Sequence, residues 1–148
     1  MDESFSRSPT QTKSFPGQFD SLAKVGKFVT QAALAAGFDQ TAVYAVEMAV
    51  DEACTNIIEH AYGGEEQGDI ECTCQVSPGE LTVTLRDFGR PFDPASVPEP
   101  NIHARLEERR EGGLGLFLMR KLMDEVHFEF TADAGNVLTL VKRKERSV

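Results

Sequence analysis

The stretch from Val50 to Tyr62 reads VDEACTNIIEHAY and combines an apolar helical stripe with a pair of polar side chains. Glu52 and Asn56 lie four residues apart, so in a helix both project from nearly the same side. An Asn oxygen is a suitable ligand for a hard cation such as Mg²⁺, and a nearby carboxylate is able to orient or deprotonate an attacking hydroxyl. The alternative interpretation is a solvated Glu and Asn on an exposed helix face.

Two helices are expected around this stretch. Apolar residues recur at helical spacing from Phe19, with Ser21 as a plausible cap and Gly37 as a natural C-terminal stop. The second helix is expected from about Gln40 to Tyr62, because a continuous apolar stripe runs through it and Gly63-Gly64 ends it.

Alternating apolar residues predict strands on both sides of a third helix. The expected strands are an edge strand at 12–15, a hairpin at 70–76 and 81–85, and a closing hairpin at 126–131 and 137–141. The third helix is expected from Leu114 to Glu125. This order predicts an α/β sandwich of two layers, with a mixed, mainly antiparallel sheet and the helices on one face.

The composition favours one folded domain of an acidic, cytoplasmic protein. The chain has 148 residues, and we expect a loose lead-in at 1–14 followed by a single domain at 15–148. A formal charge of −9 and a pI near 4.8 oppose nonspecific binding to nucleic acid or anionic lipid and favour a basic partner surface. The longest uncharged stretch, 28–38, is too short to span a membrane, and the N-terminus lacks a signal peptide pattern.

The three cysteines, Cys54, Cys72 and Cys74, suit neither a disulfide framework nor a closed zinc site. Cys72 and Cys74 are two residues apart in an expected strand. We therefore expect both thiols to fill one face of the sheet.

A second motif, Arg86-Asp87-Phe88-Gly89-Arg90-Pro91, stands where an expected strand ends. A carboxylate at that place is able to accept a hydrogen bond from an exocyclic amine such as that of adenine, and the glycine permits close backbone approach. An ordinary strand-to-turn Asp-x-Gly is the alternative. The Asp-Phe-Gly triplet of protein kinases is excluded, because the glycine loop, strand lysine and His-Arg-Asp loop of that family are missing.

A third motif, Glu111-Gly112-Gly113-Leu114-Gly115-Leu116-Phe117, leads from a long proline-containing loop at 88–113 into the third helix. Helix N-termini expose unpaired N–H groups, and glycines let phosphates reach them, so the motif predicts a phosphate cradle. It is neither a Walker A loop nor a Rossmann fingerprint. Glycine-rich helix starts also arise from tight packing alone.

Taken in this order, the three motifs resemble the N, G1 and G2 boxes of the GHKL ATPases, which share the Bergerat fold. The resemblance covers about residues 15–143. Within that superfamily, the compact length, the run at 50–62 and the run at 111–118 resemble the RsbW-type serine kinases that act as anti-sigma factors.

The resemblance implies ATP and Mg²⁺ as ligands and a role for each matched residue. Asn56 would bind Mg²⁺, Glu52 would be the general base, Asp87 would bind the adenine amine, and Gly89 would approach the base. Gly113 and Gly115 would hold the phosphates.

The loop at 92–112 is similar to the ATP lid of that family. Arg110 is the candidate for a γ-phosphate contact, and Arg105 and Arg109 are its rivals. A Gly-Thr pair usually starts the last strand, whereas this chain has Gly135-Asn136. Asn136 or Thr139 would then supply the polar contact near adenine.

The implied function is an ATP-dependent serine/threonine protein kinase that phosphorylates a STAS-domain antagonist and sequesters a sigma factor. A homodimer is the oligomeric state that the family suggests. The alternative is a non-catalytic, nucleotide-gated module that binds a partner protein. Retention of Glu52 favours the enzyme.

Overall fold

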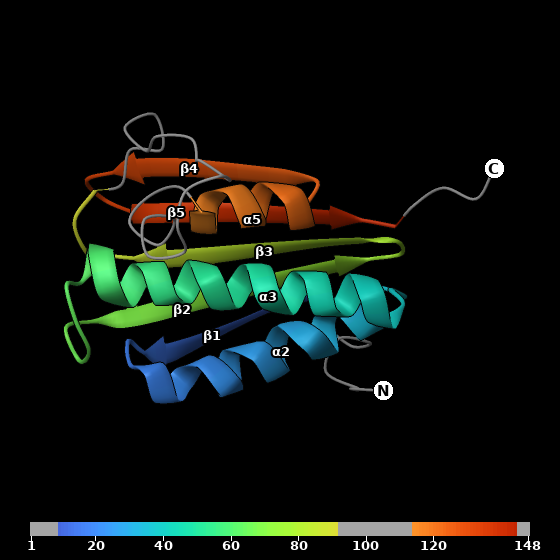
Figure 1. Cartoon of the computed structure of the whole chain (residues 1–148), viewed down its shortest axis with the longest axis horizontal. Helices are drawn as coiled ribbons and strands as arrows, with labels where there is room; N and C mark the ends of the chain where they lie inside the picture. The colour runs from blue at the N-terminus through green and yellow to red at the C-terminus, as the bar shows by residue number, and fades with distance from the viewer. Residues whose placement is uncertain (1–8, 92–113, 145–148) are drawn as a thin grey trace.

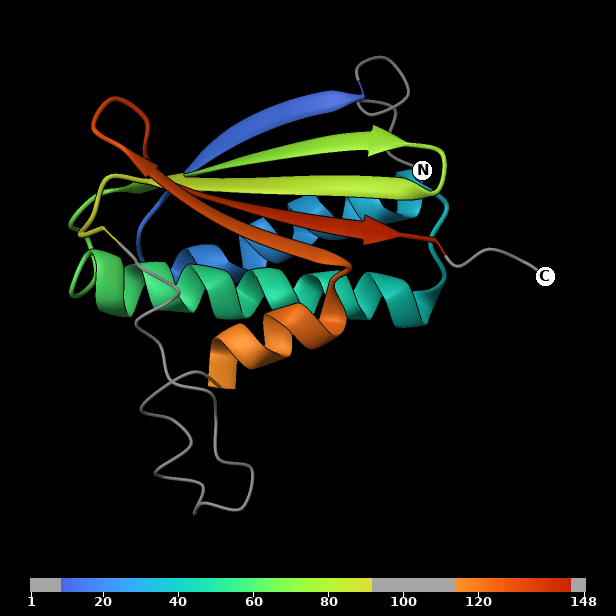
Figure 2. The same cartoon turned by 90° about the horizontal axis from the view of Figure 1, so that it is seen from above.

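Among the residues that the structure describes, the sheet has five strands in the order β1-β2-β3-β5-β4, and every neighbouring pair is antiparallel. This architecture comes from a computed structural model, which describes residues 9–91 and 114–144. The helices cover one face of the sheet and leave the other uncovered (Figures 1 and 2). The strands are β1 (Thr10–Pro16), β2 (Asp69–Ser77), β3 (Glu80–Asp87), β4 (Glu125–Thr131) and β5 (Gly135–Arg143). The expected two-layer α/β sandwich is confirmed.

The strands alternate as their sequences predict. Cys72 and Cys74 of β2 are fully buried and share the face that the helices cover, as expected. On the same face of β3, Leu85 precedes Asp87, and Asp87 pairs with Asn136 of β5. β1 already begins at Thr10, so residues 10–14 of the expected lead-in are part of the sheet.

Two antiparallel-packed helices, α2 (Leu22–Ala35) and α3 (Gln40–Asn56), follow β1 and a short 3-10 turn, η1 (Phe19–Ser21). The Asp39 carboxylate caps α3 by accepting a hydrogen bond from the Ala42 N–H at 2.9 Å. Gly37 ends the first helical region with φ of +91°, as its position predicts. Ser21 stands at the N-cap position of α2, as expected, but its hydroxyl donates to the Pro16 carbonyl at 2.7 Å and makes no capping hydrogen bond.

The end of the second helix differs from the expected uniform α-helix. After Asn56 the chain widens into a π-helical segment, η2 (Ile57–Ala61), in which the Tyr62 N–H donates to the Ile57 carbonyl at 2.9 Å. Gly63 and Gly64 then leave the helix with positive φ angles of +72° and +149°, which confirms the predicted stop. Single π-helical turns inside longer helices are frequent at functional sites.

The third helix, α5 (Leu114–Leu122), is shorter than the expected span to Glu125. The Asp124 N–H donates to the Val141 carbonyl at 2.8 Å, and the Asp124 carboxylate accepts from the Arg143 N–H at 2.6 Å. These bonds to β5 turn the chain out of the helix, so Glu125 begins β4 instead.

The core lies between the helical layer and the sheet. It includes Val46, Val50 and Cys54 from α3 and Leu85 and Leu140 from the sheet, each at most 1% exposed. Among the described residues, no helix is long and apolar enough to cross a membrane.

Candidate functional site

The first and third motifs meet where α3 and α5 pack together. Gly115 of α5 lies against both polar side chains of the first motif, since a Cβ at Gly115 would stand 2.7 Å from Glu52 Oε1 and 3.0 Å from Asn56 Nδ2. Contacts under 3.0 Å are essentially never made by real Cβ atoms, so only glycine fits here without displacing a neighbour. The solvated-face alternative for Glu52 and Asn56 is therefore wrong: both side chains border the start of α5.

The environment of Glu52 raises the pKa of its carboxyl. Partial burial is the largest cause, and the negative charges of Asp51 and Glu59 add to it. A carboxylate with a raised pKa is a stronger proton acceptor than an ordinary surface glutamate. The electrostatics thus suit a general base.

The second motif forms its own cluster at the end of β3. Asp87 is only 3% exposed, and its Oδ1 accepts hydrogen bonds from the Gly89 N–H and from Asn136 Nδ2, both at 2.9 Å. The Asn136 amide also donates to the Arg90 carbonyl at 2.8 Å. The two hydrogen bonds to Asp87 are both accepted by Oδ1 and do not involve Oδ2.

Burial raises the pKa of Asp87, while the two bonds to its Oδ1 oppose that rise by stabilising the charged form. Asn136 is thus the polar side chain of β5 that contacts Asp87, and its contact with adenine remains a prediction. The alternative donor, Thr139, is wrong: it pairs with Thr84 and alternates with buried Leu138 and Leu140, so it lies on the uncovered face of the sheet.

Gly89 lies directly against the π-helical segment. A Cβ at Gly89 would stand 2.4 Å from both the carbonyl carbon and oxygen of Ala61, and the neighbouring Arg90 N–H donates to that oxygen at 2.7 Å. The wider π turn thus brings a backbone carbonyl to the end of β3. Packing against Ala61 is sufficient reason for a glycine at this position, and its approach to the base remains a prediction.

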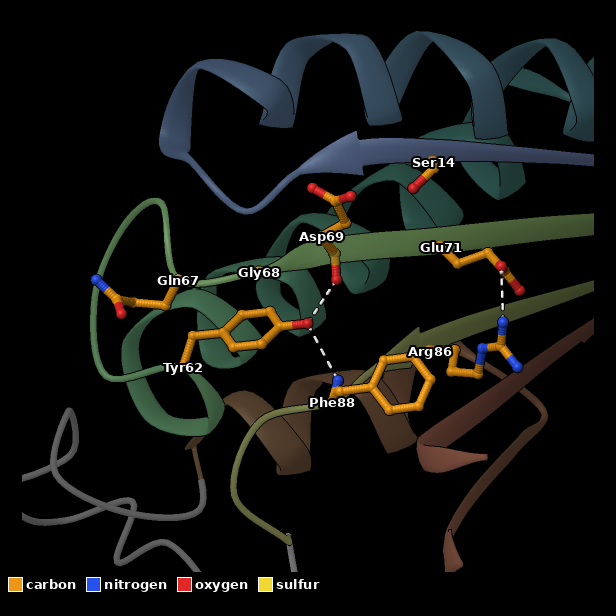
Figure 3. A pocket seen from close by; sticks show the side chains of 8 residues that line it. All are labelled: Ser14, Tyr62, Gln67, Gly68, Asp69, Glu71, Arg86 and Phe88. Carbon is orange, nitrogen blue, oxygen red and sulfur yellow. Dashed lines mark hydrogen bonds and ion pairs between the residues drawn. The ribbon is translucent and has the colours of Figure 1, made fainter. Parts of the chain in front are cut away.

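Tyr62 is a residue whose role the sequence did not reveal. Its hydroxyl donates to the Asp69 carbonyl at 2.6 Å and accepts from the Phe88 N–H at 3.1 Å (Figure 3). Its ring packs against Gly68, because a Cβ at Gly68 would stand only 2.5 Å from the Cε1 atom of the Tyr62 ring. Tyr62 thereby connects the end of the first motif to the second motif. The only sequence feature that could have indicated this role is an aromatic residue followed by several glycines.

A shallow hollow of about 320 Å³ lies beside Tyr62 on the uncovered face of the sheet (Figure 3). It is lined by Ser14, Tyr62, Gln67, Gly68, Asp69, Glu71, Arg86 and Phe88. Arg86 is paired with Glu71 at 2.8 Å and stands over the Phe88 ring at 5.3 Å. The hollow faces away from Asp87 and Asn136, so it is separate from the cluster formed by the three motifs.

Three expected features lie outside the described residues. These are Arg110 with its rivals, the phosphate-binding Gly113, and the lid at 92–112.

The residues present fit a magnesium nucleotide. Mg²⁺ in nucleotide enzymes is held by one or two protein oxygens and completes its shell with phosphates and water, and Asn56 offers one such oxygen. No cluster of three metal-ligating side chains occurs among residues 9–91 and 114–144, so a site built only from those side chains is absent there. Gly115 keeps the space beside Asn56 free of a side chain, as a phosphate cradle requires.

The antiparallel sheet, its one-sided helical layer and the contacts of the first motif with the second and the third define an ATP-binding module of the GHKL class. The chain belongs to the family described as "Histidine kinase-like ATPase domain", which matches residues 15–142. Within this class it groups with the RsbW serine-protein kinases.

The curated relatives support this grouping. Serine-protein kinase RsbW of Listeria innocua is 35% identical over 108 residues, which cover 70% of this chain and 69% of the relative. Serine-protein kinase RsbW of Bacillus velezensis is 33% identical over 115 residues, covering 74% of this chain and 71% of the relative.

Solved structures agree on the fold. The RsbU and RsbW domains of a Mycobacterium tuberculosis protein align with a TM-score of 0.66 and 17% identity, covering 95% of this chain and 34% of that one. The SiaB-SiaC complex of Pseudomonas aeruginosa gives a TM-score of 0.59 and 15% identity, covering 95% of this chain and 94% of that one. At these identities the alignments establish the fold alone.

Proposed function

We propose that this protein is an ATP-dependent serine/threonine kinase that phosphorylates a STAS-domain antagonist and, in a partner switch, sequesters a sigma factor. The observation that carries the proposal is the contact of Gly115 with Glu52 and Asn56. It brings a carboxylate with a raised pKa, an amide that would bind Mg²⁺ and the start of a helix to one place. The name shared by the relatives, serine-protein kinase RsbW, supports a serine acceptor.

In the proposed reaction, each residue of the cluster has one task. Asp87 accepts a hydrogen bond from the adenine amine through its Oδ2, while Asn136 and the Gly89 N–H hold its Oδ1. Asn56 would bind Mg²⁺, which neutralises phosphate charge when it is bound. Gly115 leaves room for the phosphates at the start of α5.

Glu52 acts on the acceptor. The serine or threonine oxygen of the partner bonds to the γ-phosphorus, the bond from that phosphorus to the β–γ bridging oxygen breaks, and ADP leaves. The hydroxyl proton passes to the Glu52 carboxylate. Positioning and charge neutralisation supply most of the rate enhancement, because phosphoryl transfer needs little covalent catalysis.

A transfer assay with radiolabelled ATP and a purified STAS-domain antagonist tests the proposal. We expect Glu52→Gln to keep ATP binding and partner binding but to lose transfer by about 10²–10⁴-fold, since only the base is removed. Asn56→Ala should instead weaken Mg²⁺-dependent ATP binding, because a metal ligand is lost. Glu47→Gln is the matched control: Glu47 is an acid on the same helix, bonded to the Thr30 hydroxyl at 3.0 Å, and its loss should leave the transfer rate at saturating antagonist unchanged.

The second candidate function is a nucleotide-gated binding module without transfer. A native protein that binds ATP and the antagonist but never labels the antagonist would establish this candidate and refute the kinase.

A further inference from the structure

Two large apolar side chains stand exposed on α3, in line with Glu52. Tyr44 is 62% exposed and Met48 is 38% exposed. Residues four apart lie above one another on a helix, about 6 Å apart along its axis, so Tyr44, Met48 and Glu52 form one line that continues to Asn56. We name Tyr44 and Met48 the α3 ridge.

The α3 ridge lies on the outward side of the middle helix. α3 runs between α2 and α5 over the sheet (Figure 1). On the α2 side, Glu47 accepts from the Thr30 hydroxyl and lies 3.7 Å from the Cβ position of Gly26. On the α5 side, Glu52 and Asn56 contact Gly115. The ridge is therefore continuous with the catalytic end of α3.

Helix α3, which carries the ridge, has ionised side chains of a single sign, whereas its neighbours α2 and α5 also carry Lys24, Lys27, Arg120 and Lys121. The sequence from Gln40 to Ala61 holds four carboxylates, Glu47, Asp51, Glu52 and Glu59, and neither lysine nor arginine. The net charge of the whole chain is −9. An apolar pair beside the carboxylates of its own helix complements a partner surface that has an apolar side chain beside lysine or arginine.

We propose that the α3 ridge is the docking surface for the phosphoacceptor protein, which places an apolar side chain on Tyr44 and Met48 and a basic side chain among the neighbouring carboxylates. This inference rests on the proposed function and deepens it. A protein segment that delivers its hydroxyl to Glu52 lies within about 6–12 Å of both ridge residues along the helix axis. Contact with the ridge fixes the orientation of the acceptor before transfer, whereas ATP binds elsewhere in the cluster.

Steady-state transfer kinetics test the docking surface. The acceptor is the purified STAS-domain antagonist, and the enzyme is the full chain carrying Tyr44→Ala together with Met48→Ala. We expect the KM for the acceptor to rise about ten- to hundred-fold, as the loss of a buried apolar anchor at an interface does. The KM for ATP, the kcat at saturating acceptor and the Tm should stay at their native values, because both side chains are exposed. Added salt should raise the acceptor KM of the native protein as well.

Leu34→Ala is the matched control, because Leu34 is an exposed apolar residue, 56% exposed, on α2 and outside the line. Its acceptor KM should equal that of the native protein. A double variant with a native acceptor KM, or a Leu34→Ala variant impaired to the same degree, would overturn the docking surface and leave the kinase intact. A double variant that keeps acceptor kinetics but fails to bind a sigma factor would also overturn it. If the native protein labels no acceptor, the proposed function fails and the docking surface with it.

Discussion

Replacing Gly115 by alanine separates the chemistry of the cluster from the stability of the fold. The new Cβ would stand 2.7 Å from Glu52 Oε1, and ordinary contact begins at 3.4 Å, so the oxygen must retreat by about 0.7 Å (3.4 − 2.7). Asn56 Nδ2, at 3.0 Å, must retreat by about 0.4 Å (3.4 − 3.0). Both are the ends of flexible side chains and are able to move. A displacement of about 1 Å costs on the order of 10²-fold in rate, so we expect transfer to fall by about 10- to 100-fold in a folded protein.

The assay is transfer of radiolabelled phosphate to the antagonist, together with thermal unfolding of each variant. Gly26→Ala is the control. Gly26 lies inside α2, and its new Cβ would stand 3.7 Å from Glu47 Cγ on α3, which is an ordinary van der Waals distance. That variant should transfer at the native rate and gain up to about 1 kcal/mol in free energy of unfolding. A folded Gly115→Ala protein that transfers at the native rate would show that Glu52 and Asn56 do not perform the chemistry.

Two further changes test the remaining contacts. Tyr62→Phe removes the hydroxyl that bonds to the Asp69 carbonyl and the Phe88 N–H, so the free energy of unfolding in urea should fall by about 1–2 kcal/mol; an unchanged midpoint would contradict this. The second concerns pH. Burial is the largest cause that raises the pKa of Glu52, and the charge of Asp51 is the next. Because transfer requires the ionised base, the transfer rate should decline as pH falls through that raised pKa. Asp51→Asn removes one repelling charge and should move this decline to lower pH, whereas a profile that stays in place would argue against Glu52 as the base.

The sequence predicted the layers, the order of helices and strands along the chain and the two hairpins, because apolar periodicity reports burial directly. It did not predict the pairing of β1 with β2 or of β3 with β5. Where it failed, a contact with another element had overridden the local pattern. The helix expected to reach Glu125 ends at Leu122, since Asp124 bonds to β5. Similarly, the Ser21 hydroxyl bonds to Pro16 and makes no capping hydrogen bond.

The candidate site was predictable in its residues but not in its geometry. The motifs identified Glu52, Asn56, Asp87 and Gly115, yet spacing along the chain does not show which side chains touch. A choice between Asn136 and Thr139 required the sheet register, since one residue of difference in a strand changes the face. The π turn at 57–61 has no sequence signal that we recognise, although it presents the Ala61 carbonyl to the end of β3.

The reactivity of the three buried cysteines measures how often the helical layer separates from the sheet. All three thiols are fully buried between the helical layer and the sheet, and burial raises the pKa of Cys54 to about 12. A thiol reagent needs both access and a thiolate, so the closed protein offers it almost no target. Alkylation therefore proceeds only when α3 separates from the strands beneath it, and its rate follows how often that separation occurs. Nucleotides and partners that clamp the layers together would slow this labelling without any introduced probe.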